Sequence, residues 1–254
     1  MKITERKGVS VLGVVTNYIE ILSTTPTKNW VIFLHGAGEV GPADGSNLQE
    51  VLKHGWPKHA RNGFDFPFNI ICPQAVVNHT TIVKVLPAWL RIKYDAIVFQ
   101  TGLSMGGYGT YDALLYDDLK LICAAAPVCG AGRLNLIDNY KHHPPIWHFH
   151  GALDPTVKLN TAKGFIDKYN SLYDPDIKLT VYPEVLHNAW DKAYSVTEGE
   201  DELLQWTMIQ FANAPKENID EIKTSVNIFL QSYQRSVNDM FTAVNQLAKS
   251  IDGD

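Results

Sequence analysis

TGLSMGG at residues 101–107 is the stretch that decides the fold. A short apolar run over 96–100 precedes it, and a stretch long enough for a helix, 105–118, follows it. The serine therefore lies where a buried strand turns sharply into a helix, and only glycine fits two residues before it and two residues after it. Such a turn holds the Ser104 hydroxyl clear of the sheet and sets the Met105 amide at the start of the helix. We interpret Ser104 as a candidate nucleophile; the alternative is an ordinary strand-to-helix turn.

The same alternation of short apolar runs and longer helical stretches extends along the chain on both sides of this turn. The apolar runs, each too short for a helix, cover 30–34, 68–72, 96–100, 121–126, 146–149 and 177–182. The stretches that are long enough for helices cover 47–62, 80–93, 105–118, 133–142, 158–172 and 200–213. Residues 11–22 have the β-branched content of a hairpin or meander at a sheet edge. The pattern predicts an α/β protein with a mostly parallel sheet and helices on both faces.

The chain after Pro215 shows a different pattern. From Ile222 to Ile251, apolar residues recur three or four positions apart, so one stripe runs along a helix of about 30 residues. We expect one catalytic domain over 1–214 and an amphipathic helical extension over 215–254. Two roles stay open for this long C-terminal helix: it packs on its own domain, or it is an arm through which copies of the chain form a homo-oligomer.

Composition excludes several classes of protein. The 254 residues are a typical length for one α/β domain, and 45% hydrophobic residues indicate a globular chain. The net charge of −5 and pI near 6.0 exclude the basic footprint that nucleic acids and anionic membranes require. The three cysteines lie in or next to apolar runs, which favours buried thiols over a disulfide. No signal-like or membrane-spanning run is present, so we expect a cytoplasmic protein, with a secreted origin left open.

A second glycine-rich turn, HGAGE at 35–39, follows the apolar run over 30–34. Its glycines let the backbone approach a substrate carbonyl closely, and its amides can point at the oxygen that becomes negative during acyl transfer. We expect the amides of Ala37 and Met105 to form this oxyanion hole; the alternative is an ordinary turn at a strand end. Glu39 is either a wall of the substrate pocket or a solvated turn carboxylate.

A serine nucleophile needs a histidine base that a carboxylate orients. In proteins with this kind of turn the chain order is serine, acid, histidine. The acid candidate is Asp154, directly after the run over 146–149. Its rivals are Asp174 and Asp176, which precede the next strand, and Asp191, which lies beyond the histidine.

The base candidate is His187, in the loop after the last predicted strand, where an imidazole can reach the serine. Of the eight other histidines, His35 opens the glycine-rich turn and is expected to brace it. His148 and His150 share one face of a strand and suggest a metal site. No cysteine or acidic cluster with ligand spacing accompanies them, so we predict no metal.

Six strings of the chain together resemble one known group of enzymes. They are HGAGEVG at 35–41, CPQ at 72–74, TGLSMGGYGTYDA at 101–113, AAAPVCGAG at 124–132, HGALDPTV at 150–157 and VYPEVLHNAW at 181–190. They resemble the esterase branch of the α/β-hydrolase superfamily, which includes phospholipase/carboxylesterase-like, polyhydroxybutyrate depolymerase-like and feruloyl esterase-like proteins and predicted peptidases. The resemblance covers about residues 29–213. It implies the α/β-hydrolase fold, a triad of Ser104, Asp154 and His187, and the same two oxyanion amides.

Together these features predict a serine esterase that cleaves carboxylic esters through an acyl-enzyme and needs no cofactor. Little chain is left for a lid over the site, which suits a small soluble or polymer-linked ester better than a micellar lipid. Trp190, Trp89 and Trp56 are candidate walls of the cleft, and each has core or surface packing as its alternative. Two other functions stay open: a serine peptidase with the same triad, and a noncatalytic scaffold that oligomerises through the C-terminal helix.

Overall fold

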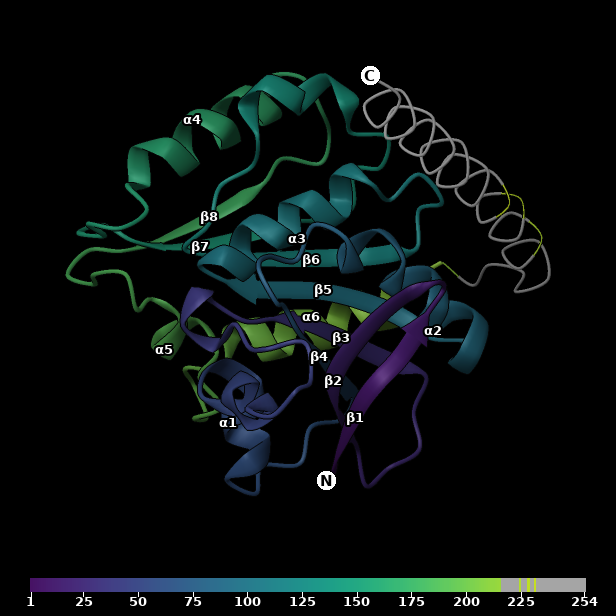
Figure 1. The fold of residues 1–254 in the computed structure, drawn as a ribbon. Coiled ribbons are helices and arrows are strands. Elements are labelled where there is room, and N and C mark those ends of the chain that lie inside the picture. Colours follow the sequence, from purple (N-terminus) through teal and green to yellow (C-terminus); the bar gives the residue numbers. More distant parts are fainter. Residues whose placement is uncertain (216–223, 225–227, 229–230, 232–254) are drawn as a thin grey trace, which may run out of the picture. The chain divides into compact units, whose positions relative to one another are not determined.

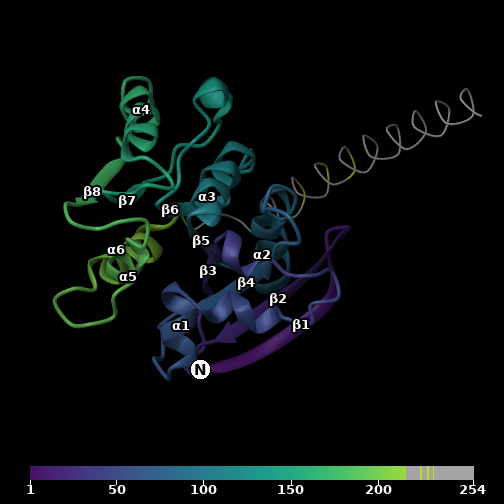
Figure 2. The ribbon, with the colours of Figure 1, turned by 60° about the vertical axis from the view of Figure 1, so that its left-hand side comes forward.

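The computed structural model describes residues 1–215 together with 224, 228 and 231. Within residues 1–215 the chain forms one eight-stranded sheet with helices on both of its faces (Figures 1 and 2). This confirms the α/β architecture predicted from the sequence. All but residues 224, 228 and 231 of the helix predicted over 222–251 fall outside the described residues, so the helix and its two alternative roles stay predictions.

The sheet has the order β1-β2-β4-β3-β5-β6-β7-β8. Its strands are β1 Lys2–Val11, β2 Val14–Leu22, β3 Asn29–Leu34, β4 Asn69–Gln74, β5 Ile97–Leu103, β6 Ile122–Val128, β7 Trp147–Gly151 and β8 Lys178–Tyr182. β1 and β2 form an antiparallel hairpin, and β2 pairs antiparallel with β4; the pairs from β4 through β8 are parallel. Because parallel strands point the same way, the loops after them gather along one edge of the sheet.

Helices cover both faces of the sheet. They are α1 Gly55–Arg61, α2 Leu86–Tyr94, α3 Met105–Leu115, α4 Leu159–Asn170, α5 Trp190–Ala193 and α6 Glu202–Asn213, with short 3₁₀ helices η1 Ala37–Glu39, η2 Leu48–Leu52, η3 Ile82–Lys84 and η4 Leu134–Asn139. α2, α3 and α4 lie on one face, and α1, α5 and α6 lie on the other (Figure 2). Among the described residues, no helix combines the length and the apolar character needed to cross a membrane.

The helix predicted over 133–142 is wrong. Only the six-residue 3₁₀ helix η4 forms there. Its aspartate and asparagines favour turns over helix interiors, and the prolines Pro144 and Pro145 prevent a helix from continuing.

Two hydrophobic clusters, one on each face, hold the helices to the sheet. On the α2, α3 and α4 side, Trp89, Tyr111 and Phe165 are among the buried side chains. On the other side, the Trp56 ring packs against Phe99, and Phe99 contacts Trp206 of α6. The central strands are buried on both faces, as the continuous apolar runs of the sequence indicate. This rigid core fixes the edge at which the loops after β3, β5, β7 and β8 meet.

Candidate active site

The turn from β5 into α3 places Ser104 in a strained backbone conformation. Its φ of 53° and ψ of −115° lie in a region that non-glycine residues rarely occupy. A Cβ on Gly102 would lie 2.5 Å from the Gly106 carbonyl oxygen, and a Cβ on Gly106 would lie 2.0 Å from the Leu34 carbonyl oxygen. Both glycines are therefore required by backbone packing, for the reason expected from the sequence.

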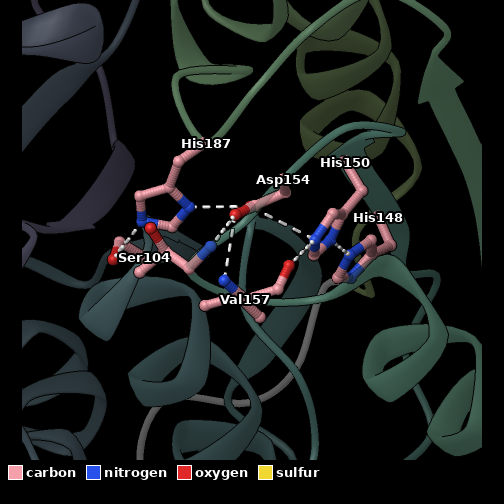
Figure 3. A network of polar contacts seen from close by, with 7 residues as sticks. Ser104, His148, His150, Asp154, Val157 and His187 are labelled. Carbon is pink, nitrogen blue, oxygen red and sulfur yellow. Dashed lines mark hydrogen bonds and ion pairs between the residues drawn. The ribbon is translucent and has the colours of Figure 1, made fainter.

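The structure brings Ser104, His187 and Asp154 together, although they lie far apart in the chain (Figure 3). His187 Nε2 lies 2.8 Å from Ser104 Oγ, and His187 Nδ1 lies 2.7 Å from Asp154 Oδ2. The three residues follow β5, β7 and β8, so each comes from the carboxyl end of a parallel strand. The aspartate side chain is fully buried, and the imidazole is 21% exposed.

The Asp154 carboxylate is fixed on both of its oxygens. Oδ1 accepts hydrogen bonds from the Thr156 amide at 2.8 Å and from the Val157 amide at 2.9 Å. Oδ2 faces His187, so this ring nitrogen donates and leaves Nε2 free to accept from the serine hydroxyl. Of the rival acids, Asp191 instead accepts a hydrogen bond from Asn188. Asp174 and Asp176 precede β8 and so lie at its amino end.

The turn after β3 lies beside the serine. A Cβ built on Gly36 would be 3.7 Å from Ser104 Cβ. Ala37 is the first residue of η1 and Met105 is the first residue of α3. Amides in a first helical turn have no acceptor within the helix, so both can donate to a bound oxygen. The arrangement suits an oxyanion hole, and that role stays a proposal.

Two buried histidines brace this turn. The Nδ1–H of His35 donates to the Gly36 carbonyl at 2.6 Å, and the Ala75 amide donates to His35 Nε2 at 2.9 Å. His79 donates from Nε2 to the His35 carbonyl at 3.0 Å. Burial lowers the pKa of His35 to about 4 and that of His79 to about 3, so both are neutral near pH 7. The bracing role of His35 was expected, whereas no sequence motif singled out His79.

A scan against models of protein families finds no match for this chain, and a search of curated proteins finds none either. Solved structures do resemble it. A thermostable esterase is 24% identical with a TM-score of 0.59, covering 82% of this chain and 62% of its own. A truncated carbohydrate esterase from gut microbiota is 12% identical with a TM-score of 0.61, covering 82% and 96%. The acylaminoacyl peptidase of Pyrococcus horikoshii is 14% identical with a TM-score of 0.51, covering 87% and 43%.

This chain has the α/β-hydrolase fold. The chain spans 62% of the esterase and 43% of the peptidase, so each of these neighbours carries further residues beyond the shared part. At such identities the likeness concerns the fold. The positions of the polar side chains described above come from this chain's own geometry.

The candidate walls of the cleft differ in where the α/β-hydrolase fold places them. The Trp190 ring lies 5.1 Å from the His187 ring, at 84° to it. Glu39 is buried and its Oε2 accepts from the Gly36 amide at 2.8 Å. Trp89 and Trp56 do not lie beside Ser104 and His187. Each is packed in the core on one face of the sheet. The tryptophans alone carried no signal that distinguishes cleft from core.

A groove of about 520 Å³ opens beside Ser104, and its polar lining was not evident from the sequence. Side chains with polar groups around it include Asn78, His79, Thr80, Tyr108, Arg133 and Asn135. The guanidinium of Arg133 donates to Asp112 at 2.6 Å and 2.7 Å and is held at the wall of the groove. These residues come from three separate loops and helices, and no local motif identifies them.

One group of metal-ligating side chains occurs in the described part of the chain, and it overlaps the site. Cys129, Asp154 and His187 each offer a ligand atom, and these atoms lie within 4.8 Å of one another. Burial raises the pKa of the Cys129 thiol to about 12, which disfavours the thiolate that a metal would require. The aspartate and the histidine already bond each other.

Proposed function

We propose that this protein is a serine hydrolase that cleaves carboxylic esters, with Ser104 as nucleophile, His187 as base and Asp154 as the orienting acid. One observation carries the proposal: the imidazole is hydrogen-bonded to the serine hydroxyl at 2.8 Å on one side and to the aspartate carboxylate at 2.7 Å on the other. The strained turn at the serine supports it, because strain of this kind persists where function requires it.

In this reaction, His187 Nε2 takes the Ser104 proton as the oxygen attacks the ester carbonyl. The amides of Ala37 and Met105 donate to the oxyanion, while the buried carboxylate stabilises the imidazolium. The imidazolium then protonates the departing alcohol oxygen, which leaves an acyl group on the serine. Water, deprotonated by the same imidazole, releases the acid and restores the hydroxyl.

The exposed groove beside the serine suits a small or polymer-linked ester with polar groups. A peptidase is the other function of this machinery, and one structural neighbour is named as an acylaminoacyl peptidase. Matched ester and amide substrates with the same acyl group separate the two functions. We expect turnover of the ester and little of the amide; faster cleavage of the amide would reassign the protein as a peptidase.

The proposal predicts that Ser104→Ala lowers turnover of p-nitrophenyl acetate by about 10⁴-fold or more, because the nucleophile is lost. The same change should abolish labelling by a fluorophosphonate. Ser195→Ala, at a buried serine whose hydroxyl accepts from the Thr197 amide, is the matched control and should keep wild-type activity. Equal turnover in Ser104→Ala and wild type, or a label mapped to another residue, would remove Ser104 from the mechanism.

A further inference from the structure

A chain of buried polar side chains leads from Asp154 into the protein interior (Figure 3). His148 and His150 project from the same face of β7, are both fully buried, and stack with ring centroids 5.3 Å apart. The Tyr111 hydroxyl lies 2.9 Å from His148 Nδ1, and His148 Nε2 lies 2.9 Å from His150 Nδ1. His150 Nε2 lies 2.8 Å from the Val157 carbonyl oxygen. The reaction proposed above uses none of these groups.

The contacts fix where the protons of this chain lie. The Val157 carbonyl can only accept, so His150 carries its proton on Nε2. In a neutral imidazole the other nitrogen then accepts, which requires His148 to donate from Nε2. His148 Nδ1 in turn accepts from the Tyr111 hydroxyl. The hydrogen bonds can therefore form only if each group donates to the next, from Tyr111 to His148, from His148 to His150, and from His150 Nε2 to the Val157 carbonyl.

That nitrogen also faces the acid. His150 Nε2 lies 3.4 Å from Asp154 Oδ2, on the side of the carboxylate opposite His187 in Figure 3. The carboxylate offers about four acceptor positions. Two amides occupy Oδ1, while His187 and His150 lie against Oδ2. The same His150 proton bonds the Val157 carbonyl, and the Val157 amide holds Oδ1. His150 therefore touches both the carboxylate and the turn that carries it.

We propose that His150 is a positioning residue that holds the Asp154 carboxylate in line with His187, and that Tyr111 and His148 keep its proton on Nε2. The inference rests on the proposed function of the site and adds three residues that position its acid. Losing the His150 N–H frees the Val157 carbonyl and leaves a buried acceptor position on Oδ2 without its neighbour. The carboxylate then loses its fixed distance to the imidazole.

Burial supports this proton arrangement. It lowers the pKa of His148 to about 3 and also lowers the pKa of His150. Both rings are thus neutral near pH 7, as the one-way chain requires. The charged and titratable groups that face His150 are Asp154, His187 and His148. Cys129 lies beside the first two and stays a thiol, because burial raises its pKa.

The test compares His150→Phe, which keeps a ring without a donor, with His150→Gln, whose amide nitrogen can take the place of Nε2–H. Rates are divided by the number of sites that a fluorophosphonate titrates, so poorly folded protein does not count. We expect kcat for p-nitrophenyl acetate to fall about 10- to 100-fold in His150→Phe with KM nearly unchanged, since the Val157 carbonyl loses its buried hydrogen-bond donor and Asp154 Oδ2 loses the N–H that lies 3.4 Å away. The acidic limb of kcat/KM should move to lower pH, because the imidazolium loses its fixed counter-charge. His150→Gln should recover most of kcat.

His143→Phe is the matched control, because His143 is a half-buried histidine that bonds the Tyr169 hydroxyl away from the site. It should change stability without changing kcat per site or the pH profile. A purely structural His150 would behave in the same way, with fewer titrated sites but wild-type kcat and profile, and that result would overturn the proposal. So would His150→Gln and His150→Phe with equal kcat.

Nitrogen-15 spectra of the histidines in Ser104→Ala test the proton arrangement without any turnover. We expect His148 and His150 both as Nε2–H tautomers at pH 7, and Tyr111→Phe to disturb the His148 signal first. Nδ1–H on either ring would overturn the arrangement. Wild-type protein without esterase turnover would instead contradict the proposed function and leave these spectra unaffected, so the two failures are distinguishable.

Discussion

At the scale of single residues, Glu39 has its carboxylate engaged inside the protein. Oε2 accepts from the Gly36 amide at 2.8 Å, and Oε1 lies 3.6 Å from His54 Nε2. Because Gly36 directly precedes Ala37, the Glu39 side chain holds the turn that presents the Ala37 amide. Burial disagrees with the solvated turn carboxylate, which is one of the two roles that the sequence left open. The hydrogen bond to Gly36 supports a further role, in which Glu39 holds the turn whose Ala37 amide we propose as an oxyanion donor.

We therefore predict that Glu39→Ala lowers kcat for p-nitrophenyl acetate about tenfold and leaves KM nearly unchanged. The change leaves the Gly36 amide without its acceptor, at a cost of about 1–3 kcal/mol, and loosens the turn. Glu39→Gln keeps an acceptor oxygen and should retain most of kcat. Steady-state kinetics with varied acyl groups provide the measurement. A rise in KM that depends on the acyl group would show instead that Glu39 contacts substrate.

At the scale of elements, the close approach of α3 to β3 depends on a glycine. A Cβ on Gly106 would lie 2.0 Å from the Leu34 carbonyl oxygen and 2.8 Å from the His35 carbonyl oxygen, both of them backbone atoms. Gly164, inside α4, has nothing within 4 Å of the position of its Cβ. The two glycines thus form a matched pair within helices: a Cβ would clash with the backbone at Gly106 and would meet open space at Gly164.

We predict that Gly106→Ala lowers the free energy of unfolding by about 3 kcal/mol or more, because the backbone of α3 has to move away from β3. Gly164→Ala should raise it by about 0.5–1 kcal/mol, since alanine restricts the unfolded chain and favours the helix. Urea unfolding followed by circular dichroism measures both. Similar stabilities for the two variants would mean that the approach of α3 to β3 is not tight in solution.

The sequence predicted those elements whose signals are local. Buried parallel strands read as continuous apolar runs, and Gly102 and Gly106 flank the serine because the turn admits nothing larger.

β1 was missed over most of its length, because its residues are largely exposed at a sheet edge and its apolar pattern is weak. Trp89 was misplaced among the candidate cleft walls, since composition does not distinguish an aromatic ring in the core from one in a cleft. The Tyr111–His148–His150 chain depends on contacts between α3 and β7 that no local pattern encodes.

At the scale of the whole molecule, several histidines are buried in the neutral form. Burial lowers the pKa of His35 to about 4, and that of His79 and His148 to about 3. In the unfolded chain the same groups titrate near 6.5. As the pH falls below about 6.5, the unfolded chain therefore binds protons that the folded protein does not. The free energy of unfolding must decrease over this range, and it does so until the folded protein itself is protonated near pH 3–4.

His79→Gln isolates one of these protons, because glutamine does not titrate and its amide can still donate to the His35 carbonyl. Between pH 6.5 and pH 5, the variant should lose less stability than wild type, by up to about 1.5 kcal/mol, which is the contribution of one proton. Urea unfolding at several pH values measures this slope. Tyr140→Phe removes a buried donor to the Tyr111 carbonyl and should keep the wild-type slope, because burial raises the pKa of this hydroxyl and it stays protonated over the whole range. An unchanged slope in His79→Gln would mean that folded His79 binds its proton as readily as the unfolded chain does, so this histidine would be charged beneath the turn over 35–39 at pH values below about 6.5.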